Sequence, residues 1–422
     1  MRKPLRIFVP HCSDVLTDHL PHGDGLIAHG FITNLAKRGH QLHVAAQRVE
    51  MREPLPANVT VHEIPPRGGG PLFSRLDYML RVRRLLSRLK KDCYFDLVHQ
   101  LNPVFTGMSL SLVGCGLPLV LGTYVARWPD DPDAIASKGK WVGWALDYGR
   151  NVIGHAQQRR ADALLLTTPA ARNRLTQPEA LSDRVYILPH GLDTELFSPE
   201  AAWDSPERLQ AEQQKPSILF FANVLRRKGI YTLIEAFPTV AREFPASVLR
   251  IAGDGPELAE VRCRVAALPC AGQVEFLGRR ERAQAPDLYR NCSVYCLPSY
   301  GEPYGMTAAE AMSCARAVVV THAGGLEHLV HDRSGKKVPV GDAVSLAKAL
   351  SELLRNPAER RAMGHYNRQL VETTMSWDRV AQQLEEIYEQ TLQRASSTRY
   401  RHRRREAVPA EPTSRADAQE HA

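Results

Sequence analysis

The chain has 422 residues, too long for one ordinary domain and suited to two, each large enough to bury a core. Hydrophobic residues make up 44% and charged residues 24% of it, as in soluble globular proteins, and no run of eighteen or more apolar residues predicts a membrane-spanning helix. The eight cysteines form no CxxC pair, which favours buried thiols over a metal site or disulfides.

The formal net charge of +8 points to an anionic partner. Much of the excess lies in residues 75–91 and 399–405, both rich in arginine. Neither stretch carries a nucleic-acid reading motif, so we expect no nucleic acid and favour contact with anionic lipid head groups. The chain begins with a strand instead of the apolar segment of a signal peptide, which predicts a cytoplasmic protein, peripheral to the inner face of the membrane if the basic stretches bind there.

The first 46 residues predict a strand (residues 5–9), a helix that ends at Arg38-Gly39, and a second strand (residues 41–46). Between the first strand and the helix lies His22-Gly23-Asp24-Gly25. A glycine-containing turn at the carboxyl end of a strand either lets a ligand approach the backbone or merely turns the chain. Both interpretations of Gly23 and Gly25 stay open.

A basic helix is predicted over residues 75–91, after a strand at residues 59–64. It is either a core helix with a solvated face or a surface that docks on a membrane. The next strand ends at His99, which either reaches a ligand or packs at the strand end. The long segment of residues 126–154 is either a lid or a core helix. The basic helix of residues 75–91 places these apolar residues on one broad face: Leu76, Met79, Leu80, Val82, Leu85, Leu86 and Leu89. The long segment contains Trp128, Trp141, Trp144 and Tyr148.

A change of composition over residues 198–216, towards proline, glutamate and glutamine, marks the boundary between two domains. A new strand (residues 218–222) then leads into Asn223 and the cations Arg226-Arg227-Lys228. Cations at the carboxyl end of a strand and ahead of a helix suit a diphosphate. An exposed basic turn is the alternative. Gly253-Asp254-Gly255 follows the next strand and favours a structural turn.

Two carboxylates, Glu302 and Glu310, flank a glycine turn and the start of a helix that follows a strand at residues 291–298. Gly305 lets a ligand approach the backbone, and the free N–H groups of Met306 and Thr307 at a helix N-terminus favour an anion. A phosphate between the carboxylates, with a hydroxyl-bearing group on either side, has the layout of a sugar nucleotide. The spacing alone is also compatible with solvated surface charge.

Residues 297–330 resemble the signature of the retaining glycosyltransferases of family 4: Glu, seven residues, Glu, then Ala-Met and later Gly-Gly. Further pieces of that family's pattern recur in order along the chain. They are Val185-Tyr186-Ile187-Leu188-Pro189-His190-Gly191-Leu192-Asp193 with Phe197 and Pro199, Arg227-Lys228-Gly229, and Gly253-Asp254-Gly255-Pro256. The resemblance covers nearly the whole chain apart from about its last thirty residues.

The resemblance implies a GT-B fold, with two Rossmann-like doubly wound parallel-sheet domains facing each other across a cleft. The first domain (residues 1–195) would bind the acceptor and the second (residues 196–374) the nucleotide sugar. A helix (residues 375–394) would cross back to the first domain, starting at Ser376-Trp377-Asp378, and a basic disordered tail (residues 395–422) would follow.

By the same resemblance, the site residues take three roles. The expected catalytic residues are Glu302, which orients the sugar hydroxyls, and Lys228 and Arg227, which stabilise the leaving diphosphate. The expected donor-binding residues are Glu310 at the ribose, Gly305, Met306, Thr307, Asn223 and Leu277. The expected acceptor-binding residues are Gly23, Gly25 and His99. No metal and no cofactor is expected, because no DxD-like motif stands in a suitable loop.

Three positions depart from the family pattern. Gly122-Thr123-Tyr124 stands where the family often has a histidine near the donor sugar, and Ala222-Asn223 stands where it has Gly-Arg. Ala315 and Ala317 replace a glycine and a proline after the second glutamate.

We therefore expect a metal-independent retaining glycosyltransferase that moves a sugar from a UDP- or GDP-sugar to a glycan or lipid-linked acceptor, in cell-envelope polysaccharide or glycolipid synthesis. The alternatives are a catalytically silent nucleotide-binding scaffold and an enzyme like glycogen synthase or phosphorylase.

Overall fold

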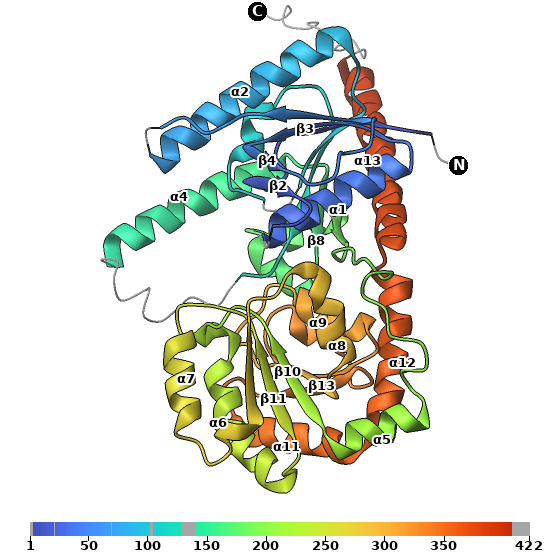
Figure 1. The fold of residues 1–422 in the computed structure, drawn as a ribbon. Helices are drawn as coiled ribbons and strands as arrows, with labels where there is room; N and C mark the ends of the chain where they lie inside the picture. The colour runs from blue at the N-terminus through green and yellow to red at the C-terminus, as the bar shows by residue number, and fades with distance from the viewer. Residues whose placement is uncertain (1–2, 21, 69, 102–103, 128–139, 407–422) are drawn as a thin grey trace, which may run out of the picture.

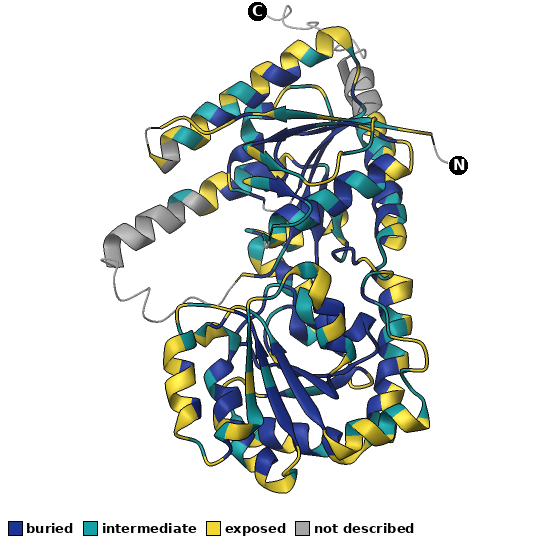
Figure 2. Cartoon of the chain, in the orientation of Figure 1, coloured by how far each residue is buried: buried dark blue, intermediate teal, exposed yellow. Residues whose placement is uncertain are grey.

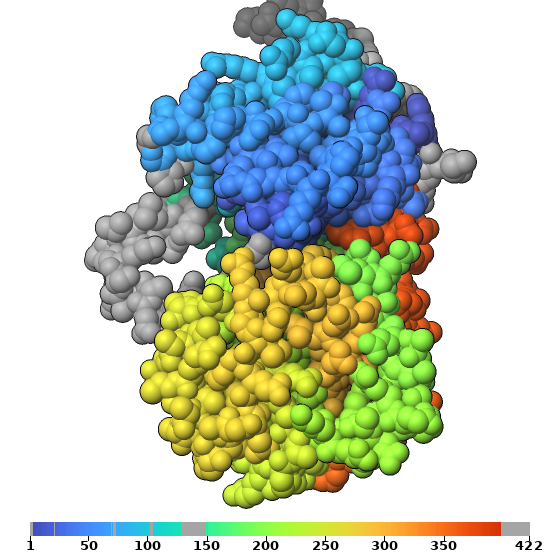
Figure 3. Space-filling view, viewed as in Figure 1, coloured from blue at the N-terminus to red at the C-terminus, as the bar shows by residue number. Residues whose placement is uncertain are grey.

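Short strands rich in valine, leucine and isoleucine alternate with helices along the chain, and in the computed structural model they form two parallel sheets, each covered by helices (Figure 1). The structure describes residues 3–20, 22–68, 70–101, 104–127 and 140–406. The sheets belong to two domains that stack end to end and meet at a waist (Figure 3). The predicted two-domain α/β architecture is confirmed.

The first sheet has seven parallel strands in the order β5-β3-β1-β6-β7-β8-β9. Its strands are β1 (Arg6–Val9), β3 (Gln41–Ala46), β5 (Val59–Glu63), β6 (Leu97–Gln100), β7 (Leu119–Tyr124), β8 (Ala163–Leu166) and β9 (Val185–Ile187). A separate parallel pair joins β2 (Val15–Thr17) to β4 (Arg48–Glu50). The helices of this domain are α1 (Gly23–Lys37), α2 (Pro71–Asp92), η1 (Met108–Leu112), α4 (Lys140–Arg159), η2 (Pro169–Arg174) and η3 (Glu179–Arg184).

The second sheet has six parallel strands in the order β12-β11-β10-β13-β14-β15. Its strands are β10 (Ser217–Phe221), β11 (Val248–Ala252), β12 (Val274–Gly278), β13 (Val294–Leu297), β14 (Ala317–Thr321) and β15 (Gly335–Val338). The helices are α5 (Pro206–Gln214), η4 (Arg226–Lys228), α6 (Ile230–Glu243), α7 (Leu258–Ala266), η5 (Ala271–Gln273), η6 (Arg282–Gln284), α8 (Ala285–Arg290), α9 (Met306–Ser313), α10 (Leu326–Leu329), α11 (Ala343–Arg355), α12 (Pro357–Thr374) and α13 (Trp377–Glu406).

The central strands are buried along their whole length, as Figure 2 shows in dark blue. Every residue of β8, β13 and β14 is buried, and β14 reads Ala-Val-Val-Val-Thr. Such unbroken apolar runs are expected where helices cover both faces of a parallel sheet. Because parallel strands end at one edge, the loops that follow β1, β6, β10 and β13 bring their side chains to the junction of the domains.

Helix α13 leaves the second domain and packs against the first, where Val380, Leu384 and Tyr388 join the core of β1 and α1. Trp377 fills a notch that only glycine permits: a Cβ on Gly30 or Gly191 would lie 1.9 Å or 2.2 Å from its ring. The tail was predicted to be disordered from residue 395, but α13 continues to Glu406, and the rest of the predicted tail, residues 407–422, lies outside the described residues. None of the helices in the described part of the chain is long and apolar enough to cross a bilayer.

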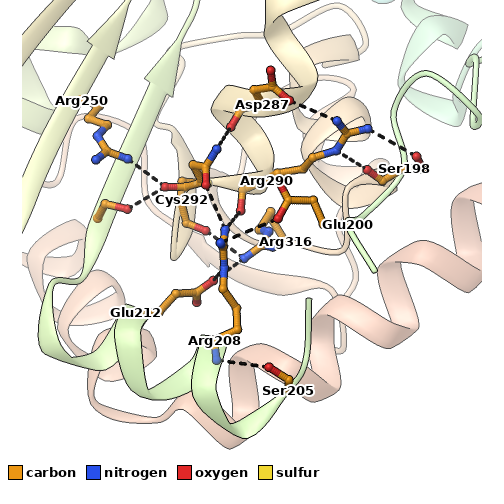
Figure 4. A network of polar contacts seen from close by, with 12 residues as sticks. Ser198, Glu200, Ser205, Arg208, Glu212, Arg250, Asp287, Arg290, Cys292 and Arg316 are labelled. Carbon is orange, nitrogen blue, oxygen red and sulfur yellow. Dashed lines mark hydrogen bonds and ion pairs between the residues drawn. The ribbon is translucent and has the colours of Figure 1, made fainter. Parts of the chain in front are cut away.

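A polar network fastens α5 and the connection between the domains to the second sheet (Figure 4). Arg290 donates to the Ser198 carbonyl at 2.7 Å, and Arg208 donates to the Arg290 carbonyl at 2.7 Å. Beneath them the buried Arg316 donates to Glu212 of α5 at 2.7 Å. Residues 198–216, whose composition marked the domain boundary in the sequence, therefore form an ordered connection, which we call the α5 strap.

Candidate functional site

Helix α9, which follows Glu302 and contains Glu310, lies where the second domain faces the first (Figure 1). Helix α9 begins at Met306, as expected, and Gly305 caps it with φ at 102°, in the left-handed region. A Cβ on Gly305 would lie 2.5 Å from Cδ2 of Leu326, the movable end of that side chain, so the left-handed φ is the main reason for glycine here. Met306 packs against the hydrophobic cores of both domains. The free N–H groups at the start of α9 therefore lie at the domain junction.

Glu302 is buried and paired with Lys228 from the other side of the site. The Lys228 Nζ atom donates to Glu302 Oε2 at 2.5 Å. Lys228 ends η4, which follows β10, while Glu302 follows β13, the neighbouring strand. The structure thus brings together two predicted catalytic residues that lie 74 positions apart in the sequence.

Glycines hold this pair in place through the backbone. Gly229 has φ at 78°, and a Cβ there would lie 1.8 Å from the Pro298 carbonyl oxygen. The Gly325 amide donates to the Glu302 carbonyl at 2.6 Å, and a Cβ on Gly324 would lie 2.4 Å from the same oxygen. The Gly-Gly motif after β14 therefore positions Glu302 by close backbone approach.

Glu310 is buried in the first turns of α9 and has two partners that the sequence analysis missed. The Tyr289 hydroxyl donates to Glu310 Oε2 at 2.8 Å, and Arg282 Nη1 lies 3.4 Å from Oε1. Burial raises the pKa of the Glu310 carboxyl, and Arg282 and Tyr289 partly offset that rise. Neither partner carried a signal in the sequence, because each comes from an element remote along the chain.

The other predicted donor-side residues lie around the same edge. Arg227 and Asn223 are exposed after β10, and Thr307 accepts a hydrogen bond from Tyr295 at 2.7 Å. Leu277 is half-buried in β12, on the far side of β11. Their roles at a nucleotide stay predictions.

Gly253 and Gly255 instead hold the backbone of residues 222–224. A Cβ on Gly253 would lie 1.9 Å from the Ala222 carbonyl oxygen, and one on Gly255 would lie 2.3 Å from that of Val224. This agrees with the structural turn favoured in the sequence analysis.

On the first domain, Gly23 and Gly25 differ in what surrounds them. Gly23 is exposed at the N-terminus of α1, and a Cβ there would meet nothing within 4 Å. Gly25 is buried, and a Cβ there would lie 2.3 Å from the Val15 carbonyl oxygen. His22 caps the helix by accepting from the Gly25 amide at 3.1 Å. Packing accounts for the glycine at position 25, and the acceptor-binding roles of Gly23 and Gly25 stay predictions.

His99 packs at the end of its strand, the second of the two interpretations left open for it, so its ring does not support the predicted role in acceptor binding. Its ring is buried, with Nδ1 2.6 Å from the Tyr388 hydroxyl of α13 and Nε2 3.1 Å from the Gly122 carbonyl oxygen. Burial lowers the pKa of His99 to about 3, so the ring stays neutral. Both nitrogens are engaged in the core, and none is left for an acceptor.

The first domain has an exposed carboxylate after β1 that the sequence analysis did not single out. Asp14 follows β1, has a side chain that is 55% exposed, and lies 3.8 Å from Nε2 of the fully buried His11. This contact lowers the pKa of the Asp14 carboxyl. Its position directly after the first predicted strand was the only feature of the sequence that could have drawn attention to Asp14. No group of three or more metal-ligating side chains is arranged to hold an ion within the part of the chain that the structure describes.

Comparison with known proteins agrees with the fold. The model of the family described as "Glycosyl transferases group 1" matches residues 202–370, and that of "Glycosyltransferase Family 4" matches residues 25–196. The structure of Anabaena HepE in complex with UDP superimposes with a TM-score of 0.68 at 18% identity, covering 92% of this chain and 100% of that one. Sucrose-phosphate synthase of Thermosynechococcus elongatus gives a TM-score of 0.66 at 22% identity, covering 92% and 99%.

Two stacked parallel-sheet domains of this kind define the GT-B class. The chain belongs to the group 1 glycosyltransferases of family 4.

Among its relatives, the alpha-maltose-1-phosphate synthase of Mycobacterium tuberculosis is 30% identical over 247 residues, which is 54% of this chain. The chain spans 63% of that enzyme's length. A GDP-mannose-dependent mannosyltransferase of Corynebacterium glutamicum, which acts on a monoacylated phosphatidylinositol monomannoside, is 27% identical over 65% of this chain and 74% of its own length.

Proposed function

We propose that this protein is a retaining glycosyltransferase that moves a sugar from a nucleotide-diphosphate donor to an acceptor hydroxyl. The observation that carries the proposal is the meeting of Glu302, Glu310 and Lys228 around the start of α9, facing the first domain. Relatives named as mannosyltransferase and maltose-1-phosphate synthase support the same class of reaction.

The site supplies fixed positive groups where the leaving diphosphate gains charge. Lys228, Arg227 and the amides of Met306 and Thr307 would stabilise that charge without rearranging during the step. Glu310 would accept hydrogen bonds from the ribose hydroxyls. Glu302, held by Lys228 and the glycine pair, would orient the sugar.

The donor C–O bond to phosphate breaks as the acceptor oxygen attacks the same face of the anomeric carbon, and the acceptor proton passes to the departing phosphate. This course preserves the anomeric configuration. It requires no metal, because the cations and amides already neutralise the diphosphate.

The acceptor would bind on the first domain near Gly23 and Asp14. A glycan or lipid-linked acceptor fits the relatives that act on phosphatidylinositol mannosides. We place the enzyme in the cytoplasm, at the inner face of the membrane, in envelope polysaccharide or glycolipid synthesis.

The proposal is tested with the purified full chain, EDTA and a panel of UDP-, GDP- and ADP-sugars. One donor should stabilise the protein by about 3 kcal/mol at a hundredfold excess over its Kd, and should slowly release nucleotide. The variant Glu302→Ala should lose nucleotide release but keep binding, whereas Glu260→Ala, an exposed carboxylate on α7, should change neither.

Binding of a donor without release by the wild-type chain, with any acceptor offered, would favour the silent scaffold. Binding of none would contradict the proposed site.

A further inference from the structure

The outward side of α2 carries large apolar side chains that the core does not cover. Phe73, Leu76 and Leu80 are 55%, 50% and 54% exposed. At 100° per residue they fall on one stripe of the helix, opposite the buried Tyr78, Val82, Leu85 and Leu86. The sequence analysis had placed Leu76 and Leu80 on the same face as the buried residues. The apolar face is narrower than predicted, and the remainder points to water (Figure 2).

The same stripe becomes cationic towards the end of the helix. A hollow of about 430 Å³ there is lined by Leu80, Arg83, Arg84, Ser87, Arg88 and Lys91. A second hollow, of about 420 Å³, lies between α2 and the edge strand β5. Arg84 and Arg88 line both. Glu63 also lines the second hollow, but no carboxylate forms an ion pair with Arg84 or Arg88 within the described ranges, and both arginine side chains are exposed.

Exposed apolar side chains also lie elsewhere on the first domain, at the end of η1, which packs against α2, and on α4, which packs against η1. Val113 after η1 is 38% exposed, and Val152 and Ile153 on α4 are 52% and 44% exposed. Six of the eleven exposed large hydrophobic side chains in the described part of the chain therefore lie on α2, η1's end and α4. A stripe of exposed apolar side chains along one helix marks an interaction surface, whereas scattered single residues do not.

We propose that the outward stripe of α2 docks on an anionic phospholipid surface. Head-group phosphates would occupy the two hollows at Arg84 and Arg88, and Phe73, Leu76 and Leu80 would enter the boundary of the acyl chains. A soluble polyanion would satisfy the arginines but leave the apolar side chains in water. The composition of the stripe thus selects a partner that is both anionic and apolar.

The site of docking does not depend on the proposed transfer reaction, and its test does not measure activity. The purified full chain is sedimented with vesicles of phosphatidylcholine alone and of a roughly 3:1 mixture with phosphatidylglycerol. Binding to the mixed vesicles should fall about tenfold or more in Arg84→Gln/Arg88→Gln, since each cation near an anionic surface adds appreciably to affinity. Phe73→Ser/Leu80→Ser should weaken it at least as much.

Matched controls lie on the second domain. Arg242→Gln/Lys348→Gln removes two exposed cations there, and Val344→Ser removes an apolar side chain that is 81% exposed. Both should bind vesicles like the wild type, and residues 399–405 are kept in all variants. Equal binding by the α2 variants and the controls would overturn the proposal. So would tight binding to inorganic polyphosphate that needs the arginines, with no vesicle binding, because the partner would then be a soluble polyanion.

Discussion

Single residues at the junction of the domains differ in whether they hold the fold or face a ligand. His99 and Glu310 are both buried ionisable groups. The histidine uses both nitrogens inside the core, whereas the carboxylate of Glu310 sits at the first turns of α9 beside Arg282. Burial alone therefore does not tell a residue that holds the fold from one that can face a ligand. The hydrogen-bond partners of the side chain make that distinction.

If Glu310 binds the ribose as proposed, its raised pKa predicts that nucleotide binding depends on pH. A carboxylate can accept from two ribose hydroxyls, but its protonated form accepts less well. As pH falls through the raised pKa of Glu310, affinity for the nucleotide should drop, and at a higher pH than an ordinary glutamate would cause. Glu310→Gln should weaken binding by about tenfold and flatten that pH profile, as followed by calorimetry between neutral and mildly acidic pH. A wild-type profile retained by the glutamine variant would assign the titration to another group.

At the scale of elements, the sequence predicted strands and helices well where apolar periodicity was long. The unbroken apolar runs of β13 and β14 and the glycine before α9 were all readable from the sequence. Contacts between remote elements were not: Arg282 and Tyr289 reach Glu310 only through the fold. The exposure of the apolar side chains on the outer side of α2 was missed. Periodicity identifies the apolar face of a helix, but it does not show how much of that face the core covers.

The α5 strap gives a test at this scale (Figure 4). Glu212 lies 2.7 Å from Arg316 and 3.9 Å from Arg360, and both guanidinium groups are buried. Burial lowers the pKa of Arg360, and Glu212 opposes that shift. Glu212→Ala would leave two buried cations unpaired, so we expect a loss of about 3 to 5 kcal/mol in the free energy of unfolding.

Glu207→Ala is the matched control, since Glu207 is an exposed carboxylate on the same helix. The free energy of unfolding of both variants is measured by urea titration. Glu207→Ala should change it by less than about 0.5 kcal/mol. A loss of that small size in Glu212→Ala would mean that the two arginines are satisfied without it.

Across the whole molecule, the two domains are tied by the segment of residues 190–192 and by α13. Leu192 bonds through its amide to the Met375 carbonyl at 2.7 Å, and the His190 ring lies 4.9 Å from that of Tyr304, in the loop between the two carboxylates. Glu385 of α13 receives two hydrogen bonds at 2.8 Å from Arg38 of the first domain. The motif around His190 and Gly191 could be recognised in the sequence as a family pattern. Only the structure shows its physical role, in which Gly191 makes room for Trp377 and His190 packs against Tyr304.

The central claim is that the carboxyl edge of the second sheet binds a nucleoside diphosphate through Lys228. Titration calorimetry with UDP, GDP and ADP in EDTA tests it most directly, comparing wild type, Lys228→Ala and the exposed Lys348→Ala on α11. We predict that one diphosphate binds wild type and Lys348→Ala alike, and binds Lys228→Ala about 10- to 100-fold more weakly, because a charge-assisted contact is lost. Equal binding to all three proteins would contradict the account.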